Sequence, residues 1–428
     1  MKVALLNPNW RFDGSIYFGC REPHLPLELG ITGAMLENAG HAVRLIDGHL
    51  FGLSLEDITA ELAAFRPDIT VVTTAPTYLF WRCAPPELRV PQELCARVRH
   101  LSPLLVAVGP HGSTTPRAAL CKLDADIVVM GECEETVTKL AGGSRSGIPG
   151  ICYRESDSIR VIGGPVATRF VDLPPLSWPQ EMIGRHHHHH HRFDSRTFGL
   201  GAEVEASRGC PYSCTFCAKE HFRNGYRRRP AETILQEVGC LKRQGVEYVY
   251  FIDEIFLPNE PLLRGLVDLR IKFGVQTRID LWKPRMLELL GRAGCVSIEA
   301  GIESLTPEGR ESLDKRCKLS TEDLAERLIE AKRHIPFVQA NLIEVPQDDL
   351  ECVQRWRALM RESGIWANDP VPLFPYPGSP DYRKLWGLPD DLAWERAHDH
   401  YLRQFDDFSD IQEERPLPLR ELELERSA

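Results

Sequence analysis

The chain has 428 residues, of which 43% are hydrophobic and 26% charged, and its formal net charge is −10. This length accommodates roughly two to four domains with sizeable cores, and the composition excludes intrinsic disorder. The acidic balance argues against a nucleic-acid binder that works by neutralising phosphates. No apolar run approaches the ~18 residues of a transmembrane helix, so we expect no membrane association.

The cysteine content indicates a reducing compartment. The first residues, Met1–Trp10, lack the long apolar segment of a signal peptide, and the 13 cysteines are an odd number. A disulfide framework is improbable under these conditions, and we expect a cytoplasmic protein.

Residues 1–142 alternate short apolar runs with amphipathic stretches, which indicates βα units and a parallel sheet covered by helices. The expected strands are Lys2–Asn7, Val43–Asp47, Ile69–Thr73, Leu104–Val108 and Ile127–Met130, and the expected helices include Leu27–Ala39, Leu55–Phe65 and Val90–Leu101. Units in this order predict a flavodoxin-like domain with a doubly wound parallel sheet, whose ligands lie beyond the carboxyl ends of the strands.

Residues 143–198 are predicted to be a linker. The segment begins in the turn-rich run Gly142–Gly150, carries a hairpin around Tyr153–Ile162, and closes with six histidines, His186–His191. We interpret the histidine run as an affinity tag or a solvated linker, and a contact with a metal or substrate is the alternative.

The βα alternation resumes in residues 199–380. The expected strands are Ala202–Ser207, Tyr248–Ile252, Gln276–Leu281, Cys295–Ala300, Phe337–Glu344 and Trp366–Phe374, with helices such as Ala231–Gln244 and Thr321–His334 between them. This pattern predicts a partial (β/α)6 TIM-like barrel with its chemistry at the strand carboxyl ends. Residues 381–428 are predicted to be a short helical extension, so the fold class is α/β throughout.

Three closely spaced cysteines follow the first barrel strand. Cys210, Cys214 and Cys217 have the spacing C-x3-C-x2-C. Thiolates suit iron–sulfur clusters or zinc, but a closed zinc site or a protein-coordinated 4Fe–4S cluster needs four ligands. Three thiolates therefore suggest a cluster with one iron open to an exogenous ligand. The alternative is a zinc site completed by His221 or by a distant cysteine.

The cysteine segment, with Phe216 before the third cysteine, resembles the signature of radical S-adenosylmethionine (SAM) enzymes. Segments at later strand ends resemble the regions in which that family binds SAM. They are Phe251–Phe256 with Asp253 and Glu254, the third-strand segment with Arg278 and Asp280, and Glu299–Ser304 with Glu303 and Ser304. Phe374–Pro380 resembles the sixth-strand ending common in the cobalamin-binding branch. The resemblance implies that Phe216, Asp253, Glu254, Arg278, Glu303 and Ser304 bind SAM and that the three cysteines bind a 4Fe–4S cluster.

The resemblance also implies a chemical logic. SAM would chelate the open iron, and one electron from a donor such as flavodoxin or ferredoxin would release a 5′-deoxyadenosyl radical. That radical abstracts hydrogen from an unactivated C–H bond, while the protein positions and shields the reacting groups. No substrate-specific general base can be named.

The domain ahead of the barrel resembles the cobalamin-binding branch of this family. Its strand-end loops imply cobalamin contacts by Asn7, Thr74, Thr77, Gly109, His111, Gly131 and Glu132. Val108 and Cys133 stand where the family has glycine, and a side chain there is expected to crowd a closely bound corrin. The aromatic loop Tyr78–Pro86 is a candidate cover for one corrin face.

Two further segments have ordinary interpretations. Asp47–Gly52 fits the D-x-H-x-x-G pattern that supplies a histidine to cobalt in other proteins, but it follows the second strand, and we interpret the match as chance. Arg223, Arg227, Arg228 and Arg229 are interpreted as a solvated stretch, with an anion contact as the alternative.

The leading hypothesis is a cobalamin-dependent radical SAM methyltransferase that acts on a small or carrier-bound metabolite. The second hypothesis keeps the radical chemistry but predicts rearrangement, cyclisation or epimerisation without net methylation. The third is a non-catalytic cobalamin- or metal-sensing protein.

Overall fold

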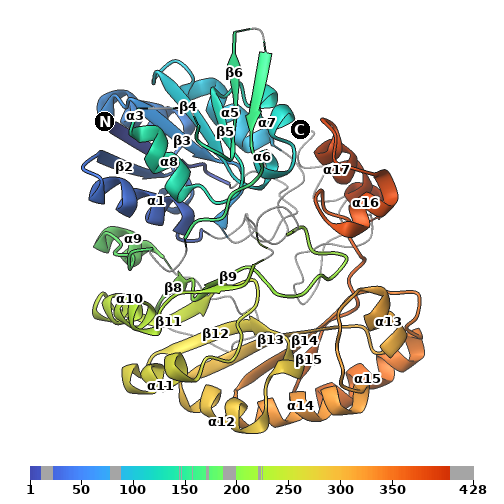
Figure 1. Ribbon diagram of the computed structural model, residues 1–428. Helices are drawn as coiled ribbons and strands as arrows, with labels where there is room; N and C mark the ends of the chain where they lie inside the picture. The colour runs from blue at the N-terminus through green and yellow to red at the C-terminus, as the bar shows by residue number, and fades with distance from the viewer. Residues whose placement is uncertain are drawn as a thin grey trace. The chain divides into compact units, whose positions relative to one another are not determined.

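A computed structural model describes residues 1–10, 23–77, 88–143, 145, 147–156, 158–169, 173–186, 199–219, 223 and 225–404 (Figure 1). The chain forms two compact units. The first unit comprises residues 1–178, 218–223 and 375–428, and the second comprises residues 179–217 and 224–374. The domain boundaries expected after residues 142, 198 and 380 stay predictions.

The first unit is built on a seven-stranded sheet with the order β2-β1-β3-β4-β5-β6-β7. Strands β1 to β5 pair in parallel, and their order, 2-1-3-4-5, is that of a flavodoxin-like doubly wound sheet, which confirms the predicted fold class. Their bounds are β1 Lys2–Asn7, β2 Ala42–Asp47, β3 Ile69–Thr73, β4 Leu104–Val108 and β5 Ile127–Val129.

Helices cover both faces of this sheet. Leu29 and Leu36 of α1 pack with Val137 and Leu140 of α8 in one apolar cluster. Helices α3, α5 and α7 contribute to a second apolar cluster. The bounds are α1 Leu27–Asn38, α2 Gly48–Phe51, α3 Leu55–Phe65, α5 Arg89–Val98, α6 Pro110–Thr114, α7 Pro116–Lys122 and α8 Glu134–Ala141. The carboxyl ends of β1 to β5 lie along one edge between these layers.

The hairpin expected within the linker belongs to the first sheet. Strand β6 (Ile151–Glu155) pairs antiparallel with β5, and β7 (Ser158–Ile162) pairs antiparallel with β6. Ile151 and Cys152 are buried, so pairing removes apolar surface from water that a detached hairpin would expose.

The second unit is built on a six-stranded parallel sheet with the order β15-β14-β13-β12-β11-β8, as expected of a partial barrel. The strands are β8 Leu200–Val204, β11 Val246–Phe251, β12 Lys272–Thr277, β13 Cys295–Glu303, β14 Phe337–Leu342 and β15 Trp366–Ala367. Two short strands, β9 (Ser207–Arg208) and β10 (Arg227–Arg228), pair antiparallel beside it.

Helices alternate with these strands along the chain (Figure 1). They are α9 Gln180–Arg185, α10 Ala231–Arg243, α11 Glu260–Leu269, α12 Pro284–Arg292, α13 Pro307–Ser312, α14 Thr321–His334 and α15 Leu350–Glu362. Ser320 begins α14 with a capping box in which Asp323 takes part, and this satisfies amides that the helix leaves without partners. None of the helices in the described ranges combines the length and apolarity needed to span a bilayer.

The third barrel strand ends earlier than predicted. The sequence favours a strand over Gln276–Leu281, whereas β12 ends at Thr277 and a 3₁₀ turn covers Ile279–Leu281. Thr277 Oγ1 donates to the Phe256 carbonyl and accepts a hydrogen bond from Trp282 Nε1. These contacts draw the chain into a turn, so Arg278 and Asp280 lie at the carboxyl end of the sheet.

The sixth barrel strand is also shorter than predicted. Instead of Trp366–Phe374, β15 covers only Trp366–Ala367, and Val371 forms an isolated bridge with Ile343. Proline at 370 and 372 removes ladder donors. The Asn368 amide replaces them by accepting from the Leu342 N–H and donating to the Leu342 carbonyl.

Beyond the sixth strand, α16 (Pro380–Trp386) and α17 (Ala393–Gln404) belong to the first unit. Trp394 of α17 is 4% exposed, and its ring centroid lies 4.2 Å from that of His111. Its Nε1 donates to Thr115 Oγ1 at 3.0 Å. Helix α17 therefore packs on α6 and on Thr115, which follows it.

We expect Trp394→Ala to destabilise the protein by about 3 kcal/mol, because the change removes a buried ring and leaves a cavity. Leu385→Ala on α16 is the control, since Leu385 is 57% exposed. Thermal unfolding should show a clear decrease in Tm for the first variant only. Equal Tm values would contradict this packing role.

Candidate functional site

The cysteine loop follows β9 at the carboxyl end of the second sheet. Cys210, Cys214 and Cys217 are each partly exposed. Gly209 has φ of 79°, a left-handed conformation that favours glycine and turns the chain away from β9. The Cys217 N–H donates to the Cys214 carbonyl at 3.2 Å, and the Thr215 N–H donates to the Leu313 carbonyl at 3.0 Å.

The described residues around the cysteine loop show no preformed site for a single metal ion. Within the described ranges, no three His, Cys, Asp or Glu side chains lie close enough to share one ion. A 4Fe–4S cluster takes each thiolate on a different iron, so its cysteines need not meet at one point. His221, the predicted fourth ligand of the zinc alternative, lies outside the described residues.

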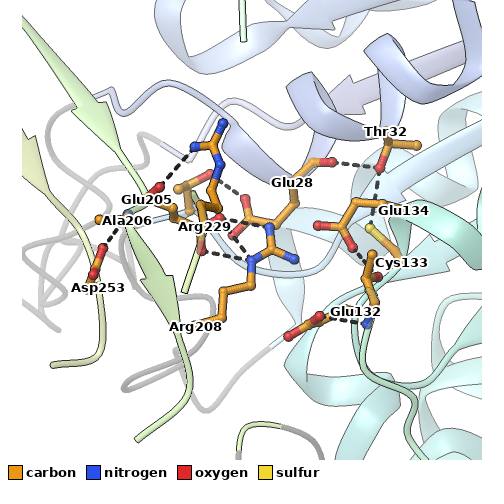
Figure 2. A network of polar contacts seen from close by, with 12 residues as sticks. Glu28, Thr32, Glu132, Cys133, Glu134, Glu205, Ala206, Arg208, Arg229 and Asp253 are labelled. Atoms are coloured by element: carbon orange, nitrogen blue, oxygen red, sulfur yellow. Dashed lines mark hydrogen bonds and ion pairs between the residues drawn. The ribbon is translucent and has the colours of Figure 1, made fainter. Parts of the chain in front are cut away.

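The acidic pair that follows β11 holds the chain that leads into the cysteine loop. Asp253 accepts hydrogen bonds from the Ala206 N–H at 2.8 Å and from Ser207 Oγ at 2.5 Å (Figure 2). Glu254 accepts one from the Gly209 N–H at 2.9 Å. Burial raises the pKa of Asp253 to about 7, although its hydrogen bonds with Ser207 and Ala206 act in the opposite direction.

Arg278 and Asp280 form a second polar pair at the end of β12. Arg278 Nε and Nη2 donate to the two carboxylate oxygens of Asp280 at 3.1 and 2.9 Å. The Arg278 guanidinium lies 3.9 Å from the centre of the Tyr212 ring. Tyr212 stands between Cys210 and Cys214 in the sequence. The sequence resemblance pointed to Arg278 as a SAM ligand, and the structure adds its contact with the cysteine loop.

Glu303 ends β13 with φ of 62°, which is unusual for a residue other than glycine. Its carboxylate forms an ion pair with Lys315, whose ammonium also donates to the Gly301 carbonyl at 2.8 Å. Burial lowers the pKa of Lys315 to about 8, and the positive charge of Arg278 acts in the same direction. Sequence analysis missed Lys315, because this lysine stands among other basic residues and matches no known motif.

Ser304 takes part in the turn that starts α13. Its Oγ donates to Asp348 at 2.8 Å, and Asp348 also accepts from the N–H groups of Leu305 and Thr306. The predicted role of Ser304 as a SAM ligand stays a prediction. Asp348, which the sequence did not single out, fixes the direction in which the chain leaves β13.

The residues predicted to contact cobalamin shape the strand-end loops of the first unit. All seven, Asn7, Thr74, Thr77, Gly109, His111, Gly131 and Glu132, are buried. They share hydrogen bonds within these loops: Asn7 donates to Asp47 at 2.9 Å, Thr77 donates to Glu28 at 2.8 Å, and His111 Nδ1 lies 3.1 Å from Thr74 Oγ1. Cobalamin contacts by these residues remain a prediction.

The two departures from the family pattern point into the hydrophobic core. Val108 and Cys133 belong to the apolar cluster between the sheet and helices α1 and α8, and they are 0% and 1% exposed. Cys133 Sγ lies 3.6 Å from Thr32 Oγ1 (Figure 2). Both side chains are core residues, and the expected crowding of a corrin stays a prediction.

Glycine 131 is required by the chain itself. Its φ is 88°, and a Cβ atom there would lie 2.2 Å from the Val166 carbonyl oxygen, which is too close for two non-bonded atoms. The adjacent Glu132 accepts from the Thr168 N–H at 2.8 Å and forms an ion pair with Arg223 at 3.0 Å. This loop is thus fixed by contacts within the first unit.

The arginine run is not a solvated stretch throughout. Arg223 is fully buried, and Arg229 is 3% exposed and forms an ion pair of 2.6 Å with Glu237. Arg227 and Arg228 form β10. The prediction of a solvated run was wrong for Arg223 and Arg229, because Arg223 pairs with Glu132, far away in the sequence, and Arg229 pairs with Glu237 on the next helix, α10.

Two other segments can be placed in part. His186 is buried, with Nδ1 2.6 Å from the Gly201 carbonyl and Nε2 3.2 Å from Glu203. The solvated interpretation was therefore wrong for His186, whereas residues 187–191 and the aromatic loop 78–86 lie outside the described residues. Asp47 accepts from the His49 and Leu50 N–H groups as the cap of α2, which gives this aspartate a local structural role.

Comparison with known proteins supports the predicted family. Residues 204–356 match the model of the radical SAM superfamily, and this segment contains the cysteine loop and most of the second sheet. Residues 204–356 form a radical SAM domain. The radical SAM family implies a 4Fe–4S cluster and SAM as cofactors, which confirms these two predictions.

Two curated relatives extend over most of this radical SAM protein. An uncharacterized methyltransferase of Pyrococcus horikoshii is 26% identical over 332 residues, which are 74% of this chain and 68% of that protein. The anaerobic magnesium-protoporphyrin IX monomethyl ester cyclase of Cereibacter sphaeroides is 26% identical over 354 residues, which are 77% of this chain and 55% of the cyclase.

A solved structure shares the fold of both units. The radical SAM methyltransferase TsrM from Kitasatospora setae, solved with its tryptophan substrate and a SAM analogue, gives a TM-score of 0.70 at 18% identity. The match covers 90% of this chain and 76% of TsrM. At this identity the likeness establishes the fold.

We expect Glu254→Ala to loosen the approach to the cysteine loop, because the Gly209 N–H loses a charged acceptor. Such a hydrogen bond contributes about 1.5–3 kcal/mol, so hydrogen exchange of this segment in the protein without cofactors should rise at least about tenfold. Glu254→Gln keeps an acceptor and should exchange at nearly the wild-type rate. Equal protection in all three proteins would contradict this role of Glu254.

Proposed function

We propose that this protein is a cobalamin-dependent radical SAM methyltransferase that methylates an unactivated carbon of a small or carrier-bound metabolite. The observation that carries the proposal is a three-cysteine loop at the carboxyl end of a parallel six-stranded sheet, preceded in the same chain by a flavodoxin-like sheet. TsrM, which shares this fold, has been solved with cobalamin and a 4Fe–4S cluster bound.

The donor set of the second unit fits a cluster and SAM. Cys210, Cys214 and Cys217 supply soft thiolates, and their partial exposure leaves room for a bound group. The methionyl part of SAM carries an amine and a carboxylate. Charges of both signs surround the site, with Glu254 among the acids and Arg278 and Lys315 among the bases.

The first unit fits cobalamin at the carboxyl edge of its sheet. Ligands of doubly wound sheets bind at this edge, and the loops after β1, β3, β4 and β5 are held there by buried hydrogen bonds. Val108 and Cys133 pack into the core. These two differences from the family pattern therefore do not oppose cobalamin binding.

When bound, SAM and the cluster supply the radical that removes hydrogen from the substrate, and cobalamin supplies the methyl group. The chain contributes the positions of these groups and excludes water from them. Asp253 and Glu254 hold the cysteine loop, and Glu303 with Lys315 orders the end of β13. The electron donor is a flavodoxin- or ferredoxin-type protein, and the protein works in the cytoplasm.

A radical rearrangement or cyclisation without net methylation is the second candidate, and the similarity to the Cereibacter cyclase favours it. Methylation is the stronger candidate, because the Pyrococcus relative and TsrM are both named methyltransferases. A sensor role is weaker still, since all three cysteines and their supporting contacts are intact.

The first experiment tests SAM cleavage and corrin binding. Protein prepared without oxygen and reconstituted with iron, sulfide and hydroxocobalamin should release 5′-deoxyadenosine from SAM when dithionite is added. A variant with Cys210, Cys214 and Cys217 all changed to Ala should release none, because it has no cluster ligands. Visible absorbance should show one bound corrin per chain in both proteins.

The outcomes separate the candidate functions. Deoxyadenosine without bound corrin would contradict the assignment of cobalamin. Deoxyadenosine with corrin, but with no transfer of a labelled methyl group to an extract of candidate metabolites, would favour the rearrangement. No deoxyadenosine from protein with a full cluster, in the presence of those metabolites, would favour a sensor.

A further inference from the structure

Arg278 is held rigidly at the carboxyl end of the second sheet. It is 6% exposed, its fork is fixed by the two oxygens of Asp280, and its Nη1 donates to the Lys315 carbonyl at 2.5 Å. Three of the five donors of the guanidinium are thus used by neighbours in the same unit. A side chain fixed in this way presents its flat face in one direction.

That face carries the ring of Tyr212. The guanidinium lies 3.9 Å from the ring centre, well within the ~6 Å range of a cation–π contact. Tyr212 is two residues after Cys210 and two before Cys214, so the contact acts in the middle of the cysteine loop. Such a contact contributes about 0.5–2 kcal/mol, with the larger value applying when water is excluded.

The loop has a second attachment to the same region. The Thr215 N–H donates to the Leu313 carbonyl at 3.0 Å, directly after Cys214. Leu313 and Lys315 lie in one turn after α13, and the Lys315 carbonyl is the acceptor of Arg278. Arg278 therefore connects the ring of Tyr212 with the turn that holds Thr215, and both contacts flank Cys214.

The cationic side chains that surround Cys214 each form an ion pair with a carboxylate. Burial by itself lowers the pKa of Arg278. The net pKa is nevertheless raised, because Arg278 forms a hydrogen bond and an ion pair with Asp280 and lies near Tyr212 and Cys214. Cys214 interacts electrostatically with Lys315 and with Arg316 as well. The acidic partners are Asp280 for Arg278, Glu303 for Lys315 and Asp314 for Arg316. Substitution of one of these three cations by a neutral residue would leave its partner carboxylate without an opposite charge in the surroundings of the Cys214 thiolate.

We propose that Arg278 is a positioning residue that fixes the cysteine loop through the ring of Tyr212 and holds a positive charge beside Cys214. The proposal rests on the proposed function, because it assumes that the three cysteines bind a cluster. Reduction adds a negative charge to the cluster, so a nearby cation favours the reduced form. Arg278 therefore acts on the cluster through the loop and through its charge.

The test uses the full chain and five variants. Tyr212→Leu removes the ring, Tyr212→Phe keeps it, Arg278→Lys keeps the charge but loses the planar fork, and Arg278→Gln loses the charge. Arg357→Lys is the matched control. Arg357 is also a buried arginine with an aspartate partner, Asp369, and a carbonyl partner, at Ala367, but it lies on α15.

The measurements are the release of iron to a chelator, the midpoint potential of the cluster, the SAM dissociation constant and hydrogen exchange of residues 209–217 without the cluster. Tyr212→Leu and Arg278→Lys should release iron about tenfold faster, as expected for the loss of a supporting partner. Arg278→Gln should also shift the midpoint potential to more negative values. Tyr212→Phe and Arg357→Lys should match the wild type.

Wild-type iron release and an unchanged midpoint potential in the Arg278 variants would overturn the proposal. A change confined to the SAM dissociation constant would also overturn it, because Arg278 would then act as a SAM ligand only. Failure of the wild type to take up iron would instead contradict the proposed function. Hydrogen exchange in the cluster-free protein would still decide the positioning role, since the contact of Arg278 with Tyr212 does not need the cluster.

Discussion

The candidate site depends on hydrogen bonds that backbone N–H groups donate to carboxylates at the ends of the strands. Asp253 and Glu254 receive N–H groups from residues 206 and 209, and Asp348 receives those of residues 305 and 306. Hydrogen bonds to charged acceptors are roughly twice as strong as those between neutral groups. They fix the irregular chain at the edge of the second sheet, where no strand ladder is available.

Several buried charges of the second unit occur in pairs of opposite sign. Arg208 with Glu205, Arg229 with Glu237 and Lys315 with Glu303 each bring a cation and a carboxylate into contact away from water (Figure 2 draws the first pair). An isolated buried charge would cost several kcal/mol, and a partner of opposite charge offsets part of that cost. Removal of either partner is therefore expected to disturb the chain around the cysteine loop.

The first unit uses close packing to shape its strand-end loops. Gly131 has no room for a side chain beside Val166, and the Trp394 ring packs against the His111 ring of α6. The side chains at 108 and 133 differ from the family pattern and are absorbed by the hydrophobic core. Differences from a motif therefore need not alter a ligand site, provided that the altered side chain points into the interior.

The sequence by itself determined the fold class and the presence of a radical SAM domain, and it singled out three cysteines as predicted cluster ligands. Alternating apolar and amphipathic runs set the order of strands and helices, and the cysteine spacing is local, so neither needed the folded chain. Only the tertiary structure decided the ends of β12 and β15, the burial of Arg223, Arg229 and His186, and the role of Lys315. Each depends on a partner from another part of the fold, such as Phe256 for Thr277 or Glu303 for Lys315. Pairing of this kind leaves no local pattern, because it arises only when parallel strands bring their carboxyl ends to one edge.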